Sequence, residues 1–250
     1  MIERLNTTLC NVPVNIAIDA TNDSPKGVFY LIHGHTGNKE DVTIRRFQTI
    51  LAQMGYEAIS LDAYAHGSRM APPYTSTDST LHALAMPEVV KHTLQDIAKI
   101  HQTHYLKNYH ICGVLGISMG GHVAYLAPQF MPFVNVIIPL IGAPHMARHY
   151  IKSKPWLADK TSEIQHIIDE LQCIHLEMYQ HIHILQINGT KDDIVHYENA
   201  FDFHVSLPKA QDVEHWFVLE EVGHIVNETM VSTVTEFMKK IDPLLERGRL

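Results

Sequence analysis

The 250-residue sequence has few cysteines and no long hydrophobic run. Cys10, Cys112 and Cys173 are odd in number and far apart, which argues against a disulfide framework or a CxxC metal site. The most apolar stretch, residues 134–144, is about half the ~20 residues that a membrane helix needs, and it contains Asn135 and two prolines. We therefore expect no membrane span.

Positive charge is also scarce. The chain has 19 Lys+Arg against 27 Asp+Glu, a formal net charge of −8, and no basic patch that would attract nucleic acid or anionic lipid. The first residues, with Glu3 and Arg4, lack the basic start and apolar segment of a signal peptide. Together with the cysteine usage, this favours a cytoplasmic protein that binds no nucleic acid.

What the sequence does contain is an alternation of short apolar runs with longer segments of helical spacing. Val226, Met230, Val234, Phe237 and Ile241 recur three or four residues apart, as on the buried face of a helix. Strands are expected at 12–18, 28–33, 57–61, 110–115, 134–140, 183–187 and 214–219, and a further helix at about 87–103. This order predicts one α/β domain over residues 1–250, with a mainly parallel, doubly wound sheet and a small helical cap at about 145–180.

The strongest chemical signal is the segment HICGVLGISMGG at 110–121, an apolar strand followed by Gly116-Ile117-Ser118-Met119-Gly120 and a helical run. This is the strand, sharp turn and helix of a G-x-S-x-G nucleophile elbow, in which glycines let the backbone fold tightly and project the serine hydroxyl. A glycine-rich turn with a capping serine is the simpler structural alternative. The context favours Ser118 as a nucleophile.

A serine nucleophile needs a base to accept its proton and a third group to orient that base. Downstream, HILQINGTKDDIV ends a strand at Gly189 and continues into Asp192-Asp193, and EHWFVLEEVGHIV leads to His224. The spacing G-x-x-D from Gly189 favours Asp192 over Asp193. The chain order Ser118, Asp192, His224, with each residue just beyond a strand, is that of an α/β-hydrolase triad.

With these motifs, residues 28–240 resemble the α/β-hydrolase superfamily, and within it compact bacterial serine carboxylesterases. His33-Gly34-His35-Thr36-Gly37 looks like the H-G-x-x-G loop of that superfamily, and DAYAHGS at 62–68 looks like its D-x-x-x-H-G-x-S segment. The resemblance implies an oxyanion hole made by the backbone N–H groups of His35 and Met119, with His33 supporting the loop. Ile194 stands where relatives often have proline.

The resulting hypothesis is a serine hydrolase that cleaves carboxylic esters of small or medium acyl chain through Ser118, His224 and Asp192. The partner is a small-molecule ester, no cofactor or metal is required, and a homodimer stays open. Short acyl chains should be preferred, because charged residues interrupt the apolar ones in the expected cap.

Several alternatives stay open. The same machinery could serve a peptidase or amidase, as the segment from His66 to Arg69 suggests, or a thioesterase or lipase. A noncatalytic ligand-binding protein could also carry this fold. Finally, the H-x-H pairs His33/His35 and His181/His183 could chelate a metal in a metallohydrolase.

Overall fold

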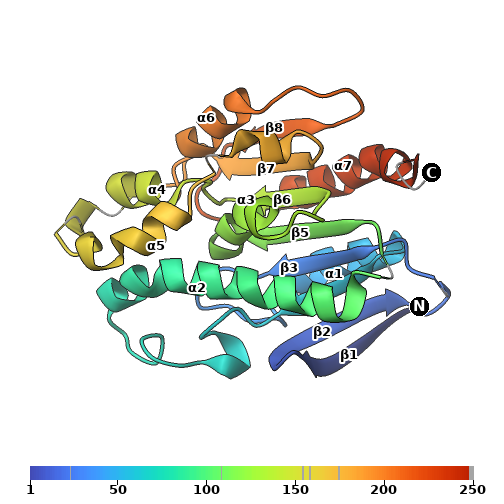
Figure 1. Ribbon diagram of the computed structural model, residues 1–250, viewed down its shortest axis with the longest axis horizontal. Coiled ribbons are helices and arrows are strands. Elements are labelled where there is room, and N and C mark those ends of the chain that lie inside the picture. The colour runs from blue at the N-terminus through green and yellow to red at the C-terminus, as the bar shows by residue number, and fades with distance from the viewer. Residues whose placement is uncertain (23, 108, 154, 158, 174, 248–250) are drawn as a thin grey trace.

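The structure is a computed structural model that describes residues 1–22, 24–107, 109–153, 155–157, 159–173 and 175–247. The described residues form an eight-stranded sheet in the order β1-β2-β4-β3-β5-β6-β7-β8 (Figure 1). Pairing is antiparallel from β1 to β2 and from β2 to β4, and parallel across the rest. The strands are β1 (Ile2–Leu9), β2 (Val12–Asp19), β3 (Val28–Ile32), β4 (Glu57–Leu61), β5 (Cys112–Ile117), β6 (Val136–Leu140), β7 (His183–Gly189) and β8 (His215–Glu220).

Helices cover both faces of the sheet, as a parallel sheet requires because both of its faces are apolar. In Figure 1, α2 and α3 lie in front of the sheet, and α1 and α7 lie behind it. The α-helices are α1 (Val42–Gln53), α2 (Ser79–Ile100), α3 (Met119–Phe130), α4 (Met146–Ser153), α5 (Gln165–Glu170), α6 (Glu198–Ser206) and α7 (Glu228–Arg247). This is the mainly parallel α/β architecture that the sequence predicts.

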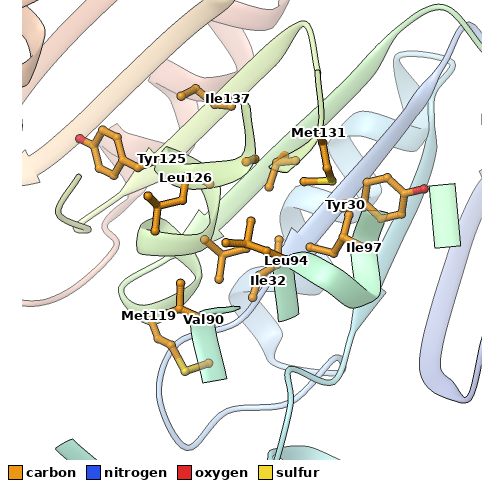
Figure 2. Packing of buried hydrophobic residues seen from close by; sticks show 14 of the residues in the cluster. Tyr30, Ile32, Val90, Leu94, Ile97, Met119, Tyr125, Leu126, Met131 and Ile137 are labelled. Carbon is orange, nitrogen blue, oxygen red and sulfur yellow. The ribbon is translucent and has the colours of Figure 1, made fainter. Parts of the chain in front are cut away.

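Alternation along each strand divides the core into two clusters. In β3, Tyr30 and Ile32 pack with α2 and α3, while Phe29 and Leu31 face α1 and α7. Figure 2 shows the first cluster, where Leu94 and Ile97 of α2 lie between β3 and α3. Met131 and Ile137 continue this layer toward β6. The predicted stripe of α7 is confirmed, since its four helical members are buried in the second cluster.

Some element boundaries were wrong. The edge strand β1 was not expected, because Ile2–Leu9 is mostly polar and has no buried apolar face: Leu5 is exposed, and Ile2 and Leu9 are only half-buried. The helix expected from Pro87 begins earlier, at Ser79, where Asp78 caps it by accepting from the N–H groups of Thr80 and Leu81. Pro87 lies buried inside the helix.

Residues between β6 and β7 form the segment in which a cap was expected, and they include α4, α5 and short 3-10 helices. Residues 154, 158 and 174 of this expected cap lie outside the described residues. The three cysteines are free, with Cys112 and Cys173 buried. None of the helices in the described ranges combines the length and the apolar character that crossing a membrane would take.

Candidate active site

Ser118 occupies a strained turn between β5 and α3. Its backbone has φ 55° and ψ −109°, a conformation that a non-glycine residue adopts only when its surroundings enforce it. The surroundings here are glycines: a Cβ at Gly116 would overlap the carbonyl oxygen of Gly120, and a Cβ at Gly120 would overlap that of Ile32. The turn is therefore as tight as a nucleophile elbow requires, and it presents the Ser118 hydroxyl to a cavity.

The structure brings Ser118, His224 and Asp192 into one hydrogen-bonded chain. His224 Nε2 lies 2.8 Å from Ser118 Oγ, and His224 Nδ1 lies 2.8 Å from Asp192 Oδ2. Because an ionised carboxylate only accepts, Nδ1 carries the proton and Nε2 is left to accept the hydroxyl hydrogen of Ser118. The arrangement suits general-base activation of the serine.

The carboxylate of Asp192 is held from both sides. Its side chain is fully buried, and its second oxygen, Oδ1, accepts from the N–H groups of Ile194 and Val195, each at 2.9 Å. Proline at position 194 could not make the first of these bonds. Asp193 is exposed, so the choice of Asp192 from its spacing to Gly189 agrees with the geometry.

The loop that follows β3 packs against the nucleophile. A Cβ at Gly34 would lie 3.7 Å from the Cβ of Ser118, an ordinary van der Waals distance, so the loop lies directly beside the nucleophile. His35 and Met119 line the same cavity as Ser118, and Met119 is the first residue of α3, where backbone N–H groups lack helical acceptors. This placement suits the two expected oxyanion donors, whose role stays a prediction.

His33 has the supporting position expected of it. The N–H of Ala63 donates to His33 Nε2 at 3.1 Å, so Nδ1 carries the proton and donates to the carbonyl of Gly34 at 2.7 Å. Burial lowers the pKa of His33 to about 4, which keeps the ring neutral near pH 7. The ring thus ties the loop after β3 to the end of β4.

Asp62 supplies a second tie to the same loop. Its buried carboxylate accepts from the backbone N–H of Lys39 at 2.8 Å, from Lys39 Nζ at 3.1 Å and from Ser68 Oγ at 2.6 Å. Burial alone would raise the pKa of Asp62, but the hydrogen bonds from Ser68 and Lys39 outweigh it and hold the pKa below its ordinary value. The segment 62–68 therefore positions the loop that carries His35.

A cavity of about 460 Å³ opens beside Ser118 and His224. Much of its wall is apolar, including Ile117, Ile141 and Val226, which suits an organic ester more than a highly charged ligand. Four further lining residues carry rings but could not be predicted from the sequence, because they come from separate elements: His82, His122, His149 and Trp156.

The H-x-H pairs have other partners in the structure. His33 is used in the loop support described above, and His183 Nδ1 accepts from the N–H of Glu214 at 3.2 Å. His181 is exposed. Within the described residues, no three or more His, Cys, Asp or Glu side chains are grouped so that they could hold a metal ion.

The fold is shared with solved structures that include an esterase. TT1662 from Thermus thermophilus superposes with a TM-score of 0.78 at 20% identity, covering 98% of this chain and 99% of that one. The Pyrococcus furiosus esterase Pf2001 superposes with a TM-score of 0.61 at 20% identity, covering 96% of this chain and 92% of that one. Est1E from Butyrivibrio proteoclasticus, solved with ferulic acid bound, superposes with a TM-score of 0.68 at 18% identity, covering 98% of this chain and 100% of that one.

No curated protein matches the chain in sequence. A family model does match it, over residues 16–232, and that model describes the dienelactone hydrolase family. The matched region runs from β2 into α7 and so includes the elbow at Ser118 and the loops that carry Asp192 and His224. The chain is a member of the dienelactone hydrolase family, within the α/β-hydrolase superfamily.

Proposed function

We propose that the protein is a serine hydrolase that cleaves carboxylic esters through an acyl-enzyme intermediate. The observation that carries the proposal is the hydrogen-bonded chain from Ser118 through His224 to the buried Asp192. Membership of the dienelactone hydrolase family and structural similarity to esterases support ester substrates.

In the first half of the reaction, Ser118 Oγ attacks the ester carbonyl while His224 Nε2 takes its proton. The Asp192 carboxylate stabilises the imidazolium that forms and keeps the ring in the tautomer that the geometry requires. The imidazolium then gives its proton to the leaving alcohol. In the second half, His224 activates water, which attacks the acyl carbonyl and releases the acid and Ser118.

The negative charge that develops on the carbonyl oxygen needs donors fixed in advance. The backbone N–H groups of His35 and Met119 fill this role in the proposal. His33 and Asp62 act through the loop, since each ties it to the end of β4 or to the segment that follows β4. They are positioning residues.

Small or medium acyl chains fit this proposal best. The segment between β6 and β7 carries charged residues such as Arg148, Asp159 and Lys160 among its apolar ones, so it offers little continuous apolar surface to a long alkyl chain. A peptidase, amidase or thioesterase would use the same residues, so comparing matched ester, thioester and amide substrates separates these activities.

The proposal is tested by the kinetics of Ser118→Ala on 4-nitrophenyl acetate. Loss of a triad member costs about 10⁴ to 10⁶ in turnover, and circular dichroism should show an unchanged fold. Asp193→Asn is the matched control, because Asp193 is exposed beside the site. If Ser118→Ala retains more than a tenth of the activity of the unmodified protein, the proposal is rejected. It is also rejected if a chelator removes the activity and added metal restores it.

A further inference from the structure

The cavity beside Ser118 has two kinds of wall. The loops that carry Asp192 and His224 contribute aliphatic residues: Ile194, Val195, Ile225 and Val226. Residues from the loop after β3, from the helices α2, α3 and α4 and from the segment after α4 contribute five rings, and α2 and α3 add Ala83, Met86 and Met119: the rings are His35, His82, His122, His149 and Trp156.

The rings are already arranged in contact with one another. The centroids of His35 and His82 lie 5.3 Å apart in an edge-to-face arrangement, and Tyr74 lies behind His82 at 4.8 Å. His122 and His149 form a second pair at 4.9 Å. Such spacings are those at which aromatic groups attract one another, so a planar ring that enters the cavity finds partners of suitable geometry.

Trp156 adds a large exposed surface to this wall. Its residue surface is 62% exposed although indole is a mainly apolar ring, and it lies on the short helix Pro155–Leu157 between β6 and β7. An exposed tryptophan that lines a cavity beside a nucleophile offers a flat apolar face to a ligand.

The chemistry of the proposed reaction decides which half of the ester meets the rings. The leaving oxygen must lie near His224 Nε2, because that atom gives it a proton. The alcohol half therefore lies beside the aliphatic residues around His224, and the acyl half extends from the carbonyl toward the rings.

The charge of the cavity restricts the acyl half further. Among the described residues that line it, none is Lys or Arg, and Asp41 brings a carboxylate that caps α1. With a formal net charge of −8 on the whole chain, an anionic acyl group would meet repulsion. We propose that the substrates are esters whose acyl group carries an uncharged aromatic ring, an inference that rests on the proposed serine esterase function.

The test compares two 4-nitrophenyl esters, of 3-phenylpropanoic acid and of 3-cyclohexylpropanoic acid. Two methylenes separate each ring from the carbonyl, so the two esters have matched intrinsic reactivity. Their rates of hydroxide-catalysed hydrolysis correct for any difference in reactivity that remains. We expect kcat/KM to be about three- to tenfold higher for the phenyl ester, the ratio that an aromatic contact contributes. Equal values, or a preference for the cyclohexyl ester, would overturn the inference.

Variants locate the effect. Trp156→Leu and His82→Leu should each lower the phenyl-to-cyclohexyl ratio, and His82→Phe should keep it because a ring remains. Phe201→Leu is the matched control, since Phe201 is an exposed ring on α6 that does not line the cavity, and both rates should be unchanged. A ratio that stays the same in both leucine variants at 82 and 156 would contradict the assignment of the rings.

A second pair of esters tests the charge. The 4-nitrophenyl ester of 3-(4-carboxyphenyl)propanoic acid should react at least about tenfold more slowly at pH 8 than its 4-carbamoyl counterpart, because only the first is anionic. Equal rates would refute the exclusion of anions. If none of these esters is hydrolysed, the proposed function itself fails, whereas hydrolysis without discrimination rejects only the inference about the acyl group.

Discussion

Replacing Asp192 by asparagine should damage catalysis in a way that the contacts of its two oxygens determine. Oδ1 accepts from two backbone N–H groups, those of Ile194 and Val195, and Oδ2 faces His224 Nδ1. Asparagine has one oxygen, which the two donors will claim because a buried donor without an acceptor is costly. The amide NH₂ must then face His224.

This orientation has two consequences for His224. An NH₂ group cannot accept, so the ring proton moves to Nε2, where it blocks acceptance of the Ser118 proton. The stabilising charge is lost as well: at about 4 Å and an effective dielectric constant of about 20, it contributes about 4 kcal/mol to the imidazolium, or about 10³ in rate. Together with the wrong tautomer, we expect turnover to fall by about 10⁴.

The assay measures kcat for Asp192→Asn and Asp193→Asn side by side on 4-nitrophenyl acetate, with thermal melts to confirm folding. Asp193→Asn should stay within about twofold of the unmodified protein, because its side chain is exposed. A loss at Asp193 larger than that at Asp192 would refute the reasoning. The reasoning would also be refuted if folded Asp192→Asn retained more than a tenth of the activity of the unmodified protein.

Three further predictions concern the cavity, the elbow and pH. For the 4-nitrophenyl esters of linear acids, kcat/KM should not rise steadily to sixteen carbons; a steady rise would indicate a lipase-like channel. Gly120→Ala should destabilise the fold by about 2 kcal/mol or more, because its Cβ would overlap the carbonyl oxygen of Ile32, whereas Gly223→Ala, with 3.6 Å of clearance, should change the Tm little. Burial lowers the pKa of His33 and His183 to about 4, below the ~6.5 of histidine in an unfolded chain. The free energy of unfolding should therefore be unaffected by these histidines above pH 6.5. As the pH drops from 6.5 toward 4, each should lower it by up to about 1.4 kcal/mol per pH unit. Melts between pH 7 and 5 should show this loss, and His183→Gln should reduce the slope.

The fold could be predicted from the sequence where a pattern is local. Buried parallel strands such as Glu57–Leu61 are short apolar runs, and their bounds were found directly. The edge strand Ile2–Leu9 was missed because it is stabilised by pairing with β2 and not by an apolar face. The helix expected from about Pro87 begins at Ser79, because Asp78 caps it there, and it runs through the proline.

In the candidate site, too, residues within local motifs could be predicted and residues brought in by tertiary packing could not. Ser118, Asp192 and His224 could be predicted to lie together because each follows a strand within a short motif, and parallel strands bring their carboxyl ends to one edge of the sheet. Trp156, His82 and His149 could not be found, because each lies in a different helix or loop and only tertiary packing brings it to the cavity. The role of Asp62 in holding Lys39 likewise depends on contacts between two loops.

The most direct measurement of the central claim is the site of covalent labelling by a fluorophosphonate probe. The protein is incubated with the probe, digested, and analysed by mass spectrometry. The account predicts one adduct per chain, on the peptide that contains Ser118, with no adduct in folded Ser118→Ala. An adduct on another residue, or ester hydrolysis by a protein that the probe neither labels nor inhibits, would contradict it.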